Sequence, residues 1–192
     1  MFSIKSSIKI GLLSILVAAI LSCNQESTLQ SFYVDNELRP GFASVDVPVS
    51  MLKIDEDVLD EEQKEAYQSV EKLSMIAFVL DDDNKADFDN EYAKVNSIVK
   101  NPKYQELMRG GTKTEGKFVV KFVGEEDSID EFVLLGQSQE KGFAVVRVLG
   151  DDMNLNKIMK LSSVFQNMDI DNSELSQFSN FFKNGLSDLD NQ

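Results

Sequence analysis

The sequence contains no histidine and no tryptophan, and Cys23 is its only cysteine. Without histidine, the chain cannot form a Ser-His-Asp triad, a Cys-His pair or a histidine-ligated zinc site. Without a second cysteine, it cannot form an intrachain disulfide. The segment Ser69-Val70-Glu71-Lys72 has the spacing of the serine–lysine pair of penicillin-recognising enzymes, but their partner motifs are absent. We therefore expect a protein that is not an enzyme and that holds no cofactor.

Basic side chains are scarce in this chain. It carries 19 lysines and arginines against 33 aspartates and glutamates, which gives a net charge of −14. Residues 1–22 hold two of the basic side chains and no acidic one, so 17 face 33 in the remainder, a charge of −16. This balance opposes nucleic-acid binding and electrostatic docking on anionic lipid headgroups. The acidic runs lack the spacing of a calcium-binding loop, so we predict no metal site.

Long apolar runs are absent as well. The longest covers residues 10–21, interrupted by one glycine and one serine, whereas a membrane-spanning helix needs about 20 residues. Two lysines precede this run, and Ile20-Leu21-Ser22-Cys23 ends it, close to the lipobox of bacterial lipoproteins. The pattern predicts a lipoprotein signal peptide over residues 1–22 and a lipid on the Cys23 thiol. A plain secretory signal and a buried free cysteine are the alternatives, and lipidation is favoured because the run stops at the cysteine.

Three segments are predicted after the signal peptide. Residues 23–41 are polar and end in Pro40-Gly41, which is typical of a tether. This lipidated tether is expected to be partly ordered around its large apolar residues, Leu29, Phe32 and Tyr33. Residues 42–168 are predicted to form one domain, and residues 169–192 a C-terminal amphipathic helix with an acidic tail.

The apolar pattern alternates between strand-like and helix-like segments. Six segments are predicted as strands, by alternation or by a short apolar run: 42–52, 75–80, 103–109, 117–123, 128–137 and 142–150. Three are predicted as helices: 57–72, 88–99 and a helix capped by Asp151-Asp152. The order β-α-β-α-β-β-β-β-α indicates a two-layer α+β fold, a mostly antiparallel sheet with helices on one face. The first β-α-β unit is predicted to be a right-handed crossover between parallel strands.

Two stretches within this order carry a resemblance to a known family. The sequence LQSFYVDNELRPGFASVDVPVSML (29–52), followed by the predicted elements up to VVRVLGDDMNLNKIMKL (145–161), resembles a domain-of-unknown-function family of small envelope lipoproteins from Bacteroidota-type bacteria. The resemblance covers about residues 29–168. It implies a lipoprotein with no established activity, and Cys23 is the one functional residue that it carries over.

The same resemblance bears on location. Members sent to the cell surface often carry several acidic residues directly after the cysteine, whereas Cys23-Asn24-Gln25-Glu26 contains one. We therefore expect a lipid-anchored envelope protein that faces the periplasm, on the outer rather than the inner membrane, with surface display left open.

Two hypotheses for function remain open at this point. The first is a non-enzymatic binding module whose partner is an envelope protein. It would contact that partner through an exposed strand edge or through the apolar side of the C-terminal helix, with Phe178, Phe181 and Phe182. These phenylalanines could instead pack on the domain itself. The second is a carrier that binds a small apolar or lipid ligand inside the domain, lined by Phe118, Phe122, Phe132, Phe143, Met159 and Phe165.

Substitution of Cys23 tests the predicted anchor. Cys23→Ala removes the thiol that would carry the lipid, so the chain should remain unprocessed or become soluble. Fractionation of cells into membrane and soluble fractions measures this. Unchanged membrane fractionation of the variant would contradict the lipoprotein interpretation.

Overall fold

The computed structural model describes residues 27–51, 54, 56–112 and 116–158. Within these residues the strands are β1 (Phe42–Pro48), β2 (Val70–Val79), β3 (Gln105–Thr112), β4 (Gly116–Glu125), β5 (Ser128–Ser138) and β6 (Gly142–Met153). The α-helices are α2 (Leu29–Asn36), α3 (Glu61–Gln68) and α4 (Phe88–Val99), with 3-10 turns η1 (Val49–Met51) and η2 (Glu56–Val58). The predicted α+β class is confirmed.

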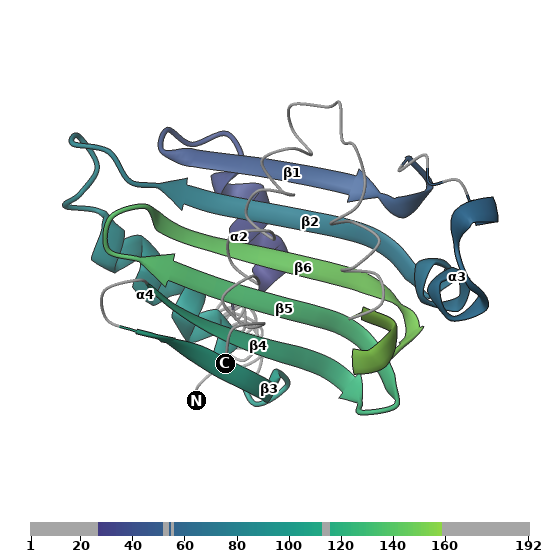
Figure 1. The fold of residues 1–192 in the computed structure, drawn as a ribbon. Helices are drawn as coiled ribbons and strands as arrows, with labels where there is room; N and C mark the ends of the chain where they lie inside the picture. The colour runs from purple at the N-terminus through teal and green to yellow at the C-terminus, as the bar shows by residue number, and fades with distance from the viewer. Residues whose placement is uncertain (1–26, 52–53, 55, 113–115, 159–192) are drawn as a thin grey trace, which may run out of the picture.

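The six strands form one open antiparallel sheet with the order β1-β2-β6-β5-β4-β3 (Figure 1). The predicted meander from β3 to β6 is confirmed, since each of these strands pairs with the next in antiparallel register. The return of β6 to pair with β2 was not predicted. It leaves β1 and β3 as the two edges and puts β6 inside the sheet, with a partner on each side.

The predicted parallel crossover between the first two strands is wrong. β1 and β2 pair antiparallel, with Phe42 opposite Phe78 and Pro48 opposite Lys72. The helix between them has eight residues and spans about 12 Å, whereas ten-residue β2 spans about 33 Å, so it is too short to return the chain across the sheet. Residues 69–72 were predicted as the end of this helix, but β2 begins at Val70, because Val70 and Leu73 pair with β6.

Both faces of the sheet carry buried apolar side chains. Helices α2 and α4 lie side by side on one face (Figure 1), where they pack on a cluster that includes Ile76, Phe143 and Val145. The opposite face carries a second cluster, to which α3 contributes Ala66. Of the two predicted helices that the structure describes in full, α4 therefore shares one face with α2, which was not predicted, and α3 contributes to the opposite face.

Helix α2 lies in the segment predicted as a tether. Thr28 caps its start: the Thr28 side chain accepts a hydrogen bond from the Ser31 amide, and the Ser31 hydroxyl accepts one from the Thr28 amide. The three apolar residues expected to become ordered here, Leu29, Phe32 and Tyr33, are all buried against the sheet. In the part of 23–41 that the structure describes, the chain is thus packed domain from Leu29 onward and not a linker.

A polar network joins α2 to the sheet beneath it. The Tyr33 hydroxyl donates to the backbone carbonyl of Val145, at 2.8 Å. The Arg147 guanidinium donates from Nε to Glu131 Oε1 at 2.6 Å and from Nη1 to Gln30 Oε1 at 3.2 Å. It also lies 5.5 Å from the centre of the Tyr33 ring. Arg147 and Glu131 are both buried, so α2 covers a salt bridge in the middle of an apolar face.

The chain leaves the sheet differently from the prediction. Asp151 and Asp152 were expected to cap a helix, but both belong to β6. Asn154 takes that role instead, since its side chain accepts a hydrogen bond from the Lys157 amide at 3.0 Å at the start of a helical turn over residues 155–158. The rest of that predicted helix and the whole of residues 169–192 lie outside the described residues.

Substitution of Tyr33 tests the docking of α2. Tyr33→Phe removes one buried hydroxyl and should lower the free energy of unfolding by about 1–2 kcal/mol at pH 8. Burial raises the pKa of Tyr33 above its ordinary value of 10.0, so the phenol stays protonated in the folded state. The unfolded chain binds fewer protons above pH 10.0, and stability should therefore fall as the pH rises through this value.

Urea unfolding at pH 8 and pH 11 measures both effects. The variant should show a smaller alkaline loss of stability than the wild type. Part of the loss should persist, because burial also raises the pKa of Tyr104, to about 12. An equal alkaline loss in variant and wild type would contradict the proposed role of Tyr33.

Candidate functional site

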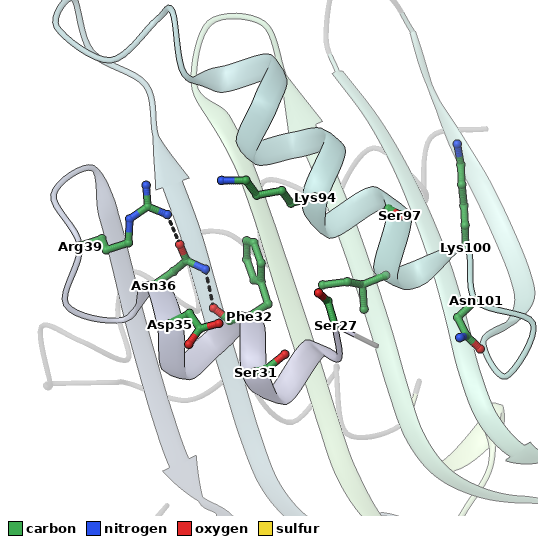
Figure 2. Close-up of a pocket in the computed structure, with 11 residues that line it drawn as sticks. Ser27, Ser31, Phe32, Asp35, Asn36, Arg39, Lys94, Ser97, Lys100 and Asn101 are labelled. Atoms are coloured by element: carbon green, nitrogen blue, oxygen red, sulfur yellow. Dashed lines mark hydrogen bonds between the residues drawn. The ribbon is translucent and has the colours of Figure 1, made fainter. Parts of the chain in front are cut away.

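A groove runs between α2 and α4 (Figure 2). Its volume is about 680 Å³, within the range of about 300–1,000 Å³ that is usual for small-molecule sites. Phe32 and Ile98 are buried and contribute the apolar part of its lining. The remaining lining side chains are polar or charged: Ser27, Ser31, Asp35, Asn36, Arg39, Lys94, Ser97, Lys100 and Asn101. This composition suits a polar ligand better than an apolar one.

Glu91 holds two of the groove's cations in place. Its Oε1 accepts hydrogen bonds from Arg39 Nη2 at 3.0 Å and from Lys94 Nζ at 2.9 Å, and its side chain is 4% exposed. Burial disfavours the charged carboxylate, but the two hydrogen bonds outweigh burial and lower the pKa of Glu91. Because Arg39 follows α2 and Glu91 belongs to α4, this contact ties the two walls of the groove together.

Arg39 is fixed by further contacts. Its Nη1 donates to Asn36 Oδ1, and Asn36 Nδ2 donates to the Phe32 carbonyl at 2.6 Å, as the dashed lines in Figure 2 show. The guanidinium also lies 5.3 Å from the centre of the Phe42 ring. The position of this positive charge is therefore set before any ligand arrives.

A second, smaller groove of about 250 Å³ lies between α4 and the strands β3 and β4. Lys100, at the end of α4, lines both grooves. Arg109 pairs with Glu106 on the same strand, β3, and Lys121 Nζ donates to the Tyr104 carbonyl at 3.1 Å. The side chains of Lys100 and Lys117 make no hydrogen bond or ion pair with the residues that the structure describes, so neither ammonium group is held by a carboxylate.

The two grooves gather positive charge in an acidic protein. Among the described residues, six basic side chains line them: Arg39, Lys94, Lys100, Arg109, Lys117 and Lys121. Two acidic side chains, Asp35 and Glu106, line them as well. The chain as a whole has 19 basic and 33 acidic side chains, so the balance around α4 is the reverse of the average. We call this surface, the lining of both grooves, the α4 face.

Of the described residues that were predicted to form a site, Phe118 lines the second groove, and the others line neither groove. Cys23, Phe178, Phe181 and Phe182 lie outside the described residues. The predicted carrier lining is not brought together: Phe122 and Phe132 belong to one apolar cluster, whereas Phe143 belongs to the cluster on the opposite face. Phe118 shares its side of β4 with Phe122, four residues on. Met159 and Phe165 are not described.

Sequence reasoning did not single out the α4 face. The available signal was the polar side of the helix over 88–99, where Lys94, Ser97 and Lys100 recur every three residues opposite the apolar stripe. That spacing places the three on one side of a helix. It does not reveal that α2 and the Arg39 loop lie opposite, because those contacts join segments more than 50 residues apart.

The described part of the chain offers no other obvious site. It contains no convergent group of three or more acidic, cysteine or histidine side chains of the kind that binds a metal ion. In the same residues, no helix has the length and apolar character needed to cross a bilayer.

Comparison with known proteins places the chain in a family. A family model described as a domain of unknown function, DUF4252, matches residues 35–161. The chain belongs to the DUF4252 family. No curated protein matches it, and no solved structure does. The match begins within α2 and includes every basic residue of the α4 face, but DUF4252 carries no assigned activity that would explain them.

Substitution of Glu91 tests how the groove is held. Glu91→Gln removes the charge that Arg39 and Lys94 share and should lower the free energy of unfolding by about 1–3 kcal/mol at pH 7. Because the pKa of Glu91 is lowered in the folded state, its stabilising effect is present above the ordinary pKa of 4.5 and is lost as the pH falls below it. Urea unfolding at pH 7 and pH 3 measures the difference.

The wild type should lose more stability between these pH values than the Glu91→Gln variant. Glu140→Gln is the matched control, since Glu140 is exposed and its side chain has no charged partner among the described residues. Equal stability of the Glu91→Gln and Glu140→Gln variants at pH 7 would show that Glu91 does not hold the groove.

Proposed function

We propose that this DUF4252 protein is a non-enzymatic binding module of the bacterial envelope, anchored by a lipid on Cys23, whose groove between α2 and α4 takes an anionic polar ligand. The observation that carries the proposal is the groove itself, a polar cavity of about 680 Å³ in a chain of net charge −14. Three basic side chains line it, and Glu91 holds two of them, Arg39 and Lys94.

The charges around the groove favour an anion. Arg39, Lys94 and Lys100 are opposed by Asp35 in the lining and by Glu91 behind it, which leaves an excess of one positive charge. Near a protein surface, two opposite unit charges about 4 Å apart attract each other by about 4 kcal/mol before desolvation is counted. Hydroxyl and amide groups from Ser97 and Asn101 add hydrogen-bonding capacity to the same wall.

The position of the groove supports a role at a membrane. Ser27 lines the groove and lies four residues after Cys23. Four extended residues span at most about 14 Å. A lipid on Cys23 would therefore hold this groove close to the bilayer surface, and two or three acyl chains would make the attachment stable.

The chemistry of the groove supports binding rather than catalysis. A general base works best with a pKa near the working pH, and the lowered pKa of Glu91 keeps this carboxylate ionised and a weak base. Lysine and arginine side chains are ordinarily protonated at neutral pH, so they supply charge and hydrogen bonds. The absence of histidine from the whole chain agrees with this assignment.

The surface expected from the sequence stays a separate prediction. Phe178, Phe181 and Phe182 would meet an envelope protein through the C-terminal helix. The two proposed contacts use different parts of the chain: the ligand binds in the groove between α2 and α4, and the partner protein binds the C-terminal helix.

Titration with a small phosphate probe tests the groove. Glycerol 1-phosphate should shift the amide resonances of Lys94, Ser97 and Lys100 in nuclear magnetic resonance spectra of the mature protein, because its phosphate can pair with the groove cations. Neutral glycerol should not. The double variant Lys94→Glu/Lys100→Glu should weaken the shifts at least about tenfold in apparent affinity, since two attractions become repulsions.

The matched control is Lys64→Glu/Lys85→Glu, which makes the same change in net charge at two lysines that line neither groove. This control should bind the probe as the wild type does. If the probe causes no shifts in the wild type, or if the two double variants weaken its binding equally, the groove is not a specific anion site.

A further inference from the structure

We propose that the α4 face docks on the bilayer itself, so that the ligand of the grooves is the phosphate headgroup layer of the membrane that holds the protein. This inference rests on the proposed function, because it requires the lipid anchor on Cys23. It goes further in naming the ligand and in fixing the orientation of the domain, with α2 and α4 toward the membrane and the opposite face of the sheet away from it.

The distribution of charge is the first argument. The six basic side chains of the α4 face lie along one helix and the segments on either side of it. Two acidic runs lie away from α4, at the start of α3 (60–62) and in the turn between β4 and β5 (125–127). The run at 81–83 lies in the connection that leads into α4, and Asp87 and Asp89 lie at the start of α4, but none of these residues lines either groove. A domain with this asymmetry is attracted to an anionic surface through one side and repelled through the others, so it is oriented as well as bound.

The uncompensated lysines are the second argument. Within the described residues, the side chains of Lys100 and Lys117 have no acidic partner. By contrast, Arg39 and Lys94 form ion pairs with Glu91, and Arg109 forms one with Glu106. Both lysines are exposed, and Lys100 stands where the two grooves meet. Headgroup phosphates spaced over a surface can reach both grooves at once, which a single small ligand in one groove cannot do.

The anchor is the third argument. Electrostatic attraction between exposed charges fades beyond about 8 Å at physiological ionic strength, so a freely diffusing protein of net charge −14 would be repelled before its basic face could engage. A lipid on Cys23 removes this barrier, because Ser27 in the first groove is then at most about 14 Å from the anchor. Tethering also gives an effective concentration on the order of millimolar, so weak contacts suffice.

The net charge alone therefore does not predict how this domain would interact with anionic lipid headgroups. The composition predicts that the domain avoids anionic headgroups. In the structure, the basic side chains that such docking needs are gathered on the face that the predicted anchor would bring to the bilayer.

Quenching of a fluorescent label on the lipidated full-length mature protein tests the inference. Because the thiol of Cys23 is taken by the lipid, Ser97→Cys on the α4 face and Glu126→Cys in the β4–β5 turn can each be labelled alone. The protein is reconstituted in vesicles of phosphatidylcholine, with or without phosphatidylglycerol, that carry a headgroup-attached quencher.

We expect the label at position 97 to be quenched at least about twofold more in vesicles with phosphatidylglycerol than in those without it, and the difference to disappear in about 0.5 M salt. The label at position 126 should respond equally in both vesicles. Lys100→Glu/Lys117→Glu should abolish the difference at position 97, and Lys64→Glu/Lys85→Glu, with the same charge change, should preserve it. Unchanged circular dichroism and melting temperature confirm that these surface variants fold.

The outcomes separate the inference from the proposed function. If the protein does not float with the vesicles, the lipid anchor fails, and the inference is overturned with it. If the protein floats but position 97 is quenched equally in both vesicles, the anchor stands and docking of the α4 face is overturned. If glycerol 1-phosphate binds in the groove while the vesicles still give equal quenching, the ligand is a soluble phosphate compound and not the membrane.

Discussion

The placement of α2 on the sheet is the contact on which the rest of the described structure depends. Tyr33 reaches from α2 through the core and donates a hydrogen bond to the Val145 carbonyl of β6, the strand with partners on both sides. Its hydroxyl also lies 3.3 Å from the Ser74 carbonyl of β2. One side chain thus connects α2 to two inner strands. Since α2 is one wall of the groove and Arg39 follows it, the geometry of the site depends on this contact.

The salt bridge beneath α2 makes that placement specific. Burying Arg147 and Glu131 costs several kcal/mol of desolvation, which their hydrogen bond at 2.6 Å offsets only in part. Helix α2 provides two further interactions for the guanidinium: Gln30 accepts a hydrogen bond from it, and the Tyr33 ring makes a cation–π contact with it. The buried charges are satisfied in one position of α2, and this position leaves the groove open beside α4.

Charge acts at two scales in this molecule. The net charge of the whole chain, −14, sets its long-range field. The local balance around α4 is reversed, because six basic side chains from three separate parts of the chain come together there. In the proposed function, a lipid on Cys23 would bring the protein to the membrane surface, and the small excess of positive charge beside the polar cavity would then favour anions. The proposed function and the proposed orientation both follow from this difference between overall and local charge.

Much of the secondary structure and some of the topology could be predicted, and the limits have physical causes. Helix α4 and the meander β3–β6 follow from apolar periodicity, because each is stabilised by contacts between residues close in sequence. Helix α2 was missed, since its polar residues look like a tether and its apolar residues have a partner only once the sheet is present. The direction of β2 was wrong, because its pairing with β1 and β6 is set by strands up to 80 residues away.

The candidate site shows even more clearly which features follow from the sequence and which depend on the tertiary structure. The sequence by itself determined the α+β class, the excess of acid, the lack of histidine and the cysteine at the end of an apolar run, since composition and local pattern are properties of the chain alone. Only the tertiary structure decided that Glu91 pairs with Arg39, that Lys100 lies between two grooves and that Phe143 and Phe132 face opposite sides of the sheet. The reason is that a groove is made by the facing surfaces of elements distant in sequence, and their relative positions are fixed by packing in the core.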